Sequence, residues 1–372
     1  MKKMSTIFLQ TDNDATHPAA AVPAPQYQAV ELLYHAFFPG FLLSIITRRS
    51  TRDAADLVFY TFRRQHIEKF LPGIEKLGLQ GLPAAVAAAQ YHYLANRLGS
   101  VKVEYIYESD RKCWIRYGSP RWAWEGATIC GIPVEVSMAM LKAWHSHNGV
   151  SLGNRRLGFV CTKHTIDGQE ALEGYYYEYD HELEPDERLS FSRGEDGPDF
   201  DPQKAPKLAS SEWPAERLQK AVRNYAMDFT RNMFAEALSL FGPADARYLI
   251  GHTLRLLGMQ YYDQTAALLG IQGDSPEAFA AYMVGMGQGQ GDDTDVSVRD
   301  GAVIVRQSSW KLMRETTTYH PALFEAWNEI WEGALNIHNR HLSITVQSRR
   351  DLGDPFFEWK IGSKRKSTLP CA

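Results

Sequence analysis

The feature that most constrains this chain is an internal repeat. The segment LGLQG at 77–81 recurs as LGIQG at 269–273, and matching residues flank both copies at nearly constant spacing. Near the end of each copy, AMLKAW matches ALFEAW. Ordered matches over so long a stretch indicate one supersecondary unit used twice. The length of 372 residues also exceeds the size at which a single core stops growing, so two domains are expected.

Each copy carries the same predicted series of elements. Apolar periodicity and turn residues indicate a helix pair, a third helix, a hairpin, a fourth helix and a second hairpin. The helix pairs are predicted at 27–48 with 52–76, and at 215–241 with 244–268. The predicted fold class is therefore α+β: two tandem copies of a helix-pair plus antiparallel-sheet domain, related by a pseudo-twofold axis.

Composition sets the boundaries between the predicted parts. In chain order, we expect a disordered leader at 1–26, a first α+β copy at 27–180, an acidic and Pro-rich linker at 181–214, a second copy at 215–361 and a basic tail at 362–372. The stretch GMGQGQG at 285–291 lacks the preceding strand of a phosphate-binding loop and is followed by two aspartates. It is therefore predicted to be a flexible loop.

Charge and hydropathy exclude several classes of partner. The net charge is −4 and the pI about 6.3, so there is no basic field for nucleic acid. The apolar stretch Ile7–Leu9 is too short for a signal sequence. No segment is expected to provide the run of about 18 apolar residues that a membrane-spanning helix needs. The sequence thus predicts a cytoplasmic protein without a membrane partner. A homodimer and a monomer both remain open.

The cysteines indicate neither a metal site nor a disulfide framework. The chain has four, Cys113, Cys130, Cys161 and Cys371, and none forms a C-x-x-C pair. A chain of this length does not depend on disulfides for its core. Reduced thiols and no structural zinc are expected.

The last part of each copy resembles small-molecule-binding domains of the 4-vinyl reductase type, and the related L-2-amino-thiazoline-4-carboxylic acid hydrolases. Those families end in a helix with a Trp, a strand, a Gly-Asp-x-x-Cys type turn and a last strand. The matching residues here are Trp327, Gly353, Asp354 and Trp359. The resemblance implies a small-molecule ligand. Because Phe356 and Phe357 replace the cysteines that often bind metal there, we expect no metal and no cofactor.

Four residues are candidates for catalysis: Cys161, His164, Glu178 and His252. A Cys near a His could act as an activated nucleophile, because a neighbouring base favours the reactive thiolate. Residues three apart on a strand point to opposite faces, however, so Cys161 and His164 could equally be a core thiol and a turn histidine.

Four more residues are candidates for binding the substrate: Trp144, His145, Tyr177 and Arg255. His252 and Arg255 are neighbours on one face of a predicted helix and would suit a carboxylate or amide ligand. The alternative for His252 and Arg255 is a structural hydrogen-bond network. The alternative for His145 is a histidine that complements the dipole at the end of a helix. The alternative for Tyr177 is a tyrosine that packs against a helix with its hydroxyl in solvent.

These residues favour one functional pocket in each chain, built chiefly from the first copy. At the positions of His145, Cys161 and His164, the second copy has Asn328, Val346 and Arg349. The leading hypothesis is a metal-independent hydrolase of a small cyclic or amide-like metabolite, bound in an aromatic-lined pocket. The alternative is a non-enzymatic small-molecule-binding or sensory protein.

Overall fold

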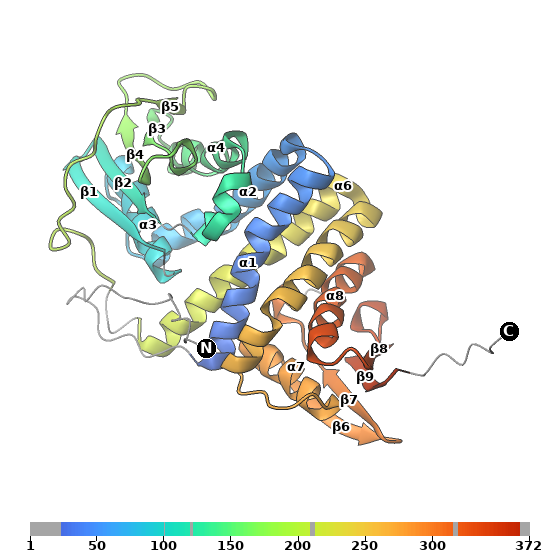
Figure 1. The fold of residues 1–372 in the computed structure, drawn as a ribbon. Helices are drawn as coiled ribbons and strands as arrows, with labels where there is room; N and C mark the ends of the chain where they lie inside the picture. Colours follow the sequence, from blue (N-terminus) through green and yellow to red (C-terminus); the bar gives the residue numbers. More distant parts are fainter. Residues whose placement is uncertain (1–23, 100, 120–121, 209–212, 315–318, 365–372) are drawn as a thin grey trace, which may run out of the picture.

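The computed structural model describes residues 24–99, 101–119, 122–208, 213–314 and 319–364. They form an α+β protein in which long helices lie between two largely antiparallel sheets (Figure 1). The predicted fold class is confirmed at this level.

The N-terminal half begins with three helices and continues into a five-stranded sheet. The elements are α1 (Pro25–Arg48), α2 (Thr51–Lys76), α3 (Ala84–Leu98), β1 (Val103–Ser109), β2 (Lys112–Gly118), α4 (Val134–Ala143), α5 (Asn148–Ser151), β3 (Leu157–Lys163), β4 (Ala171–Glu178) and β5 (Leu189–Phe191). The strand order is β1-β2-β4-β3-β5, and only the β3–β5 pair is parallel.

The C-terminal half has a four-stranded sheet in the order β6-β7-β9-β8, which matches the first four strands of the other sheet. Its elements are α6 (Ala215–Leu268), α7 (Pro276–Gln290), β6 (Thr294–Arg299), β7 (Ala302–Gln307), α8 (Pro321–His338), β8 (Leu342–Ser348) and β9 (Phe357–Ser363). Helix α6 is two helical segments joined at Gly242, whose φ of 75° and ψ of 169° are not helical. The break falls where the sequence predicted the turn of a helix pair.

Both sheets hold a buried glutamate in the same way. Glu173 on β4 lies opposite Arg116 on β2, and Glu358 on β9 lies opposite Arg306 on β7. Each pair forms a salt bridge, and the two carboxylates are 1% and 7% exposed. A buried carboxylate needs such a partner, and in both sheets an arginine on the neighbouring strand provides it.

Helix α1 corrects the expectation that no segment is long and apolar enough to cross a membrane. By length and composition alone it could do so, but 61% of its most apolar window is buried inside the protein. Phe37, Phe41 and Leu42 are fully buried in the core. Its apolar character is accounted for by packing against the rest of the protein.

The glycine-rich stretch at 285–291 is not the predicted loop, because it forms the end of α7 and its C-cap. A Cβ on Gly289 would collide with the carbonyl oxygen of Gln26 and lie 2.7 Å from the side chain of Val30. Gly291 ends the helix with a φ of 85°. The glycines therefore allow α1 to pack closely on α7.

The segment at 181–214, expected as an exposed linker, also contributes to the N-terminal half. It supplies β5 and buries Leu183, Ala205 and Trp213. Of the expected leader, residues 1–23 lie outside the described residues and α1 already begins at Pro25. Of the expected tail, residues 365–372 lie outside them, and β9 reaches Ser363.

Candidate functional site

A cavity of about 360 Å³ lies in the N-terminal half, between α2, α3 and the first turns of α6. Residues of β2 and the end of α4 complete its lining. A larger, open groove of about 710 Å³ runs between α2 and α4, but its charged residues, Asp56, Glu135, Lys142 and Arg193, are all exposed. Only the first space contains buried polar groups, and it is called the cavity below.

The wall of the cavity is aromatic and is formed by Phe62, Tyr91, Trp144, Tyr225 and Phe229. The Tyr91 and Trp144 rings are stacked with centroids 6.3 Å apart, and Phe62 lies 5.2 Å from Phe229. The Nε1 atom of Trp144 is buried without a hydrogen-bond partner among the described residues. Buried donors are nearly always paired, so this N–H marks a place where an acceptor can bind.

The floor of the cavity is a buried hydrogen-bond network. His92, Tyr117 and His145 line the cavity, and Asn148 and Tyr176 lie behind them. The Asn148 Nδ2 atom lies 2.9 Å from His92 Nε2 and 2.7 Å from the Tyr176 hydroxyl. The Tyr176 hydroxyl lies 2.6 Å from His145 Nδ1, and the Tyr117 hydroxyl 3.0 Å from His92 Nδ1.

Burial keeps His92 and Tyr176 of this floor uncharged. It lowers the pKa of His92 well below its ordinary value, with further contributions from His145 and His66. Burial also raises the pKa of Tyr176 well above its ordinary value. Neutral imidazoles and phenols can donate and accept hydrogen bonds but carry no counter-charge for an ion.

The mouth of the cavity carries four basic residues, Lys69, Lys76, Arg217 and Lys220. Lys69 pairs with Asp228, which also lines the cavity, and Lys220 pairs with Glu216, so the excess positive charge lies at Lys76 and Arg217. Lys76 Nζ lies 5.1 Å and the Arg217 guanidinium 4.0 Å from the ring centroid of Trp213. Burial, and then the nearby charges of Arg217 and Lys69, lower the pKa of Lys76. No carboxylate of the described residues forms a salt bridge with Lys76, so an anion there would relieve like-charge repulsion.

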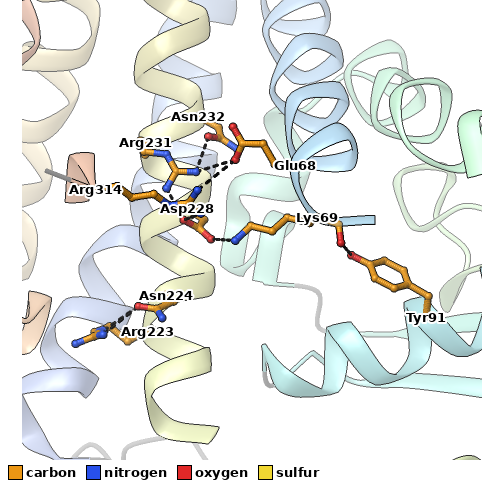
Figure 2. Close-up of polar contacts among 9 residues, drawn as sticks. All are labelled: Glu68, Lys69, Tyr91, Arg223, Asn224, Asp228, Arg231, Asn232 and Arg314. Carbon is orange, nitrogen blue, oxygen red and sulfur yellow. Dashed lines mark hydrogen bonds and ion pairs between the residues drawn. The ribbon is translucent and has the colours of Figure 1, made fainter. Parts of the chain in front are cut away.

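An ion-pair cluster beside the mouth joins the two halves (Figure 2). Asp228 on α6 accepts from Lys69 on α2 at 2.5 Å, from Arg231 at 2.5 Å and from Arg314 at 2.7 Å. Arg231 also reaches Glu68 on α2 at 3.0 Å. Burial alone would raise the pKa of Asp228, but these cations more than offset it and hold the pKa below its ordinary value. The cluster fixes the start of α6 against α2.

Two of the eight predicted site residues, Trp144 and His145, line the cavity. Cys161 is buried on β3, where its thiol donates to the Lys163 carbonyl at 3.4 Å, and His164 directly follows that strand. Glu178, at the end of β4, pairs with Arg156. None of these three lines the cavity.

The other three candidates also lie apart from the cavity lining. The Tyr177 ring packs on Tyr179, with centroids 4.8 Å apart. His252 Nε2 lies 2.6 Å from an Arg48 nitrogen, and Arg255 pairs with Glu329 at 2.5 Å. The C-terminal half contributes the start of α6 to the cavity, and the segment of α6 with His252 is not part of the lining.

Sequence reasoning missed the central residues of the floor: His66, His92, Tyr117, Asn148 and Tyr176. One signal was present, because alternation along β4 separates Tyr176 from Tyr175 and Tyr177, and Tyr176 is fully buried. A second was His92, which lies within the apolar sequence AAVAAAQYHYLANRL of α3.

The segment of the C-terminal half that matches Trp144 in sequence lies among buried tryptophans. Trp327, which matches Trp144 in the repeat, is fully buried and packs on Trp310 at 5.0 Å and on Trp331 at 5.5 Å. Trp331 follows Trp327 by the same interval as Asn148 follows Trp144. The sequence position that corresponds to Asn148 thus carries a large apolar side chain in the C-terminal half.

The described residues contain no group of three His, Cys, Asp or Glu side chains placed to hold a metal ion. Comparisons with protein-family models, with curated proteins and with solved structures found no match. The functional argument therefore depends on the geometry and chemistry of the cavity.

Proposed function

We propose that this chain binds a small organic anion with a planar ring in the cavity of its N-terminal half. The observation that carries the proposal is the division of one half-open cavity into an aromatic wall, a polar floor and a mouth with an excess of basic residues. Its volume of about 360 Å³ is typical of sites for small metabolites. A ring between Phe62, Trp144 and Phe229 would direct its anionic group towards Lys76 and its polar groups towards the floor.

A second candidate is hydrolysis of a small cyclic or amide-like metabolite in the same cavity. It is favoured by the imidazole–phenol pairs His92–Tyr117 and His145–Tyr176, which supply hydrogen-bond donors and acceptors for a small polar substrate. The resemblance to thiazoline-carboxylic acid hydrolases points to the same substrate class. The thiols of Cys113 and Cys161 do not line the cavity, so attack by water is the form of this chemistry that the residues would support.

We also propose that the two halves are tandem copies related by a pseudo-twofold axis, of which one keeps the cavity. The repeat, the shared strand order and the paired Arg–Glu bridges support this. Superposition of 27–180 on 215–361 should place Gly78 on Gly270, both of which have positive φ. We further propose a cytoplasmic location, because the apolar face of α1 is covered by the protein's own core.

Filling the cavity tests the proposed binding. Ala221 lines it from α6, so Ala221→Trp should occupy the space and weaken binding at least tenfold, a change of about 1.4 kcal/mol. The probes are the matched pair indole-3-acetate and indole-3-acetamide, measured by calorimetry, and the acid should bind the wild type more tightly than the amide.

The matched control is Ala244→Trp, the same change at an exposed position of α6, which should bind like the wild type. Equal binding by wild type and Ala221→Trp would contradict the proposal. Incubating indole-3-acetamide with the wild type and detecting released ammonia tests the hydrolase alternative in the same samples.

A further inference from the structure

The hydrogen-bond network of the floor extends beyond the cavity to Arg63 on α2. The Arg63 Nη1 atom lies 2.7 Å from His66 Nδ1, and His66 Nε2 lies 3.1 Å from Asn148 Oδ1. Asn148 in turn contacts His92 and Tyr176. A continuous chain of hydrogen bonds thus runs from a half-buried guanidinium to the imidazoles of the floor.

We propose that Arg63 is a positioning residue that fixes the tautomers of His66, His92 and His145, and with them the hydrogen-bonding polarity of the cavity floor. The inference concerns the same site and rests on the proposed function for its effect on binding. Arg63 itself is not part of the cavity lining.

The direction of the chain follows from Arg63, because a guanidinium can only donate. His66 Nδ1 must therefore accept, and in a neutral ring the proton is then on Nε2. That proton is donated to Asn148, which must present its oxygen to His66. A reversed Asn148 amide would place two donors against each other.

The remaining assignments follow from the orientation of Asn148. Its Nδ2 group donates one proton to His92 Nε2 and the other to the Tyr176 hydroxyl. His92 therefore carries its proton on Nδ1 and donates to the Tyr117 hydroxyl. The Tyr176 hydroxyl accepts from Asn148 and donates to His145 Nδ1, which places the His145 proton on Nε2.

The described residues of the C-terminal half do not form a corresponding chain of hydrogen bonds. Arg255, which matches Arg63 in the repeat, pairs with Glu329 instead. Gly258 follows Arg255 by the same interval as His66 follows Arg63, and a Cβ there would collide with the carbonyl of Ile330. The chain of hydrogen bonds is therefore found beside the cavity. The described residues of the C-terminal half do not form one at the positions that match Arg63 and His66 in sequence.

Nitrogen NMR of the full chain with ¹⁵N-labelled histidine tests the proposal without any ligand. Long-range ¹H–¹⁵N spectra distinguish protonated from unprotonated ring nitrogens, with signals assigned by His→Gln variants at 66, 92 and 145. In the wild type, we expect protons on His66 Nε2, His92 Nδ1 and His145 Nε2. The opposite tautomer at His66 or His92 would overturn the proposal, whatever the protein binds.

The variants Arg63→Met, Arg63→Lys and Arg52→Met then separate positioning from packing. Arg63→Met should give mixed tautomers at His66 and His92 and weaken indole-3-acetate binding roughly tenfold, as expected when a buried hydrogen-bonded group loses its partner. Arg63→Lys, which keeps a donor-only cation, should restore the wild-type pattern. Arg52→Met, at an exposed position of α2, should change neither readout. An unchanged tautomer pattern in Arg63→Met contradicts the proposal even if binding persists.

Discussion

Replacing Asp228 by Asn should lower the free energy of unfolding by about 2–3 kcal/mol, because the buried Arg231 loses a partner while Lys69 and Arg314 still reach solvent and both arginines keep Glu68. Asp228 is 9% exposed and contacts Lys69, Arg231 and Arg314 within 2.7 Å. The amide keeps the size of the side chain but removes its charge, so the cations then repel one another. Chemical denaturation measures the difference.

The matched control for this variant is Asp245→Asn, on the same helix. Asp245 pairs with Arg49 at the surface, where its side chain is 56% exposed, and such pairs contribute about 0–1 kcal/mol. Losses of similar size in the two variants would show that the Asp228 cluster does not hold the start of α6 against α2.

Replacing Asp292 by Asn should change how stability depends on pH. Asp292 is 4% exposed, and its Oδ1 atom accepts from Ser309 at 3.0 Å and from the Lys311 amide at 2.7 Å. Its Oδ2 atom is buried and has no partner among the described residues. Burial raises the pKa of Asp292 from 3.8 to about 7, although these hydrogen bonds oppose the shift.

The sign of the effect follows from proton binding. Between pH 3.8 and 7, the folded protein keeps the Asp292 proton while the unfolded chain has lost it, so the free energy of unfolding falls as the pH rises. Because Asn cannot ionise, the stability of Asp292→Asn relative to wild type should increase by roughly 3 kcal/mol from pH 5 to pH 8. Urea titrations at both pH values measure this, with the exposed neighbour Asp293→Asn as control. A pH-independent difference for Asp292→Asn would contradict the assignment.

Much of the fold could be predicted because its signals are local. Ser50 accepts from the backbone N–H of Asp53 at the start of α2, as an N-cap does. Asp300 and Gly301 have positive φ in the predicted hairpin turn. Such residues determine where an element begins or turns, whatever lies around it.

The glycines of α7 show where local reasoning fails. Their sequence is typical of a flexible loop, but the helix is stabilised by the close approach of α1, which only a residue without a side chain permits at Gly289. The contact joins residues more than 250 positions apart, so no local pattern reveals it. The apolar length of α1 was overlooked in a similar way and is explained by the same packing.

The site was predicted only in part, because its residues come from separate elements. His145 was singled out because the matching position of the second repeat is Asn328, and Trp144 beside it also lines the cavity. His66, His92 and Asn148 lie on α2, α3 and α5, and nothing in the sequence brings them together. Cys161 and His164 are close in the chain, and both lie outside the cavity lining.

The most direct test of the central proposal is a crystal structure of the protein with indole-3-acetate. We expect the ring between Phe62, Trp144 and Phe229, with the carboxylate near Lys76. The matched variant Lys76→Gln should lose the preference for the acid over indole-3-acetamide, whereas Lys360→Gln, exposed on β9, should retain it. Ligand density in the open groove between α2 and α4, with the cavity empty, would contradict the account.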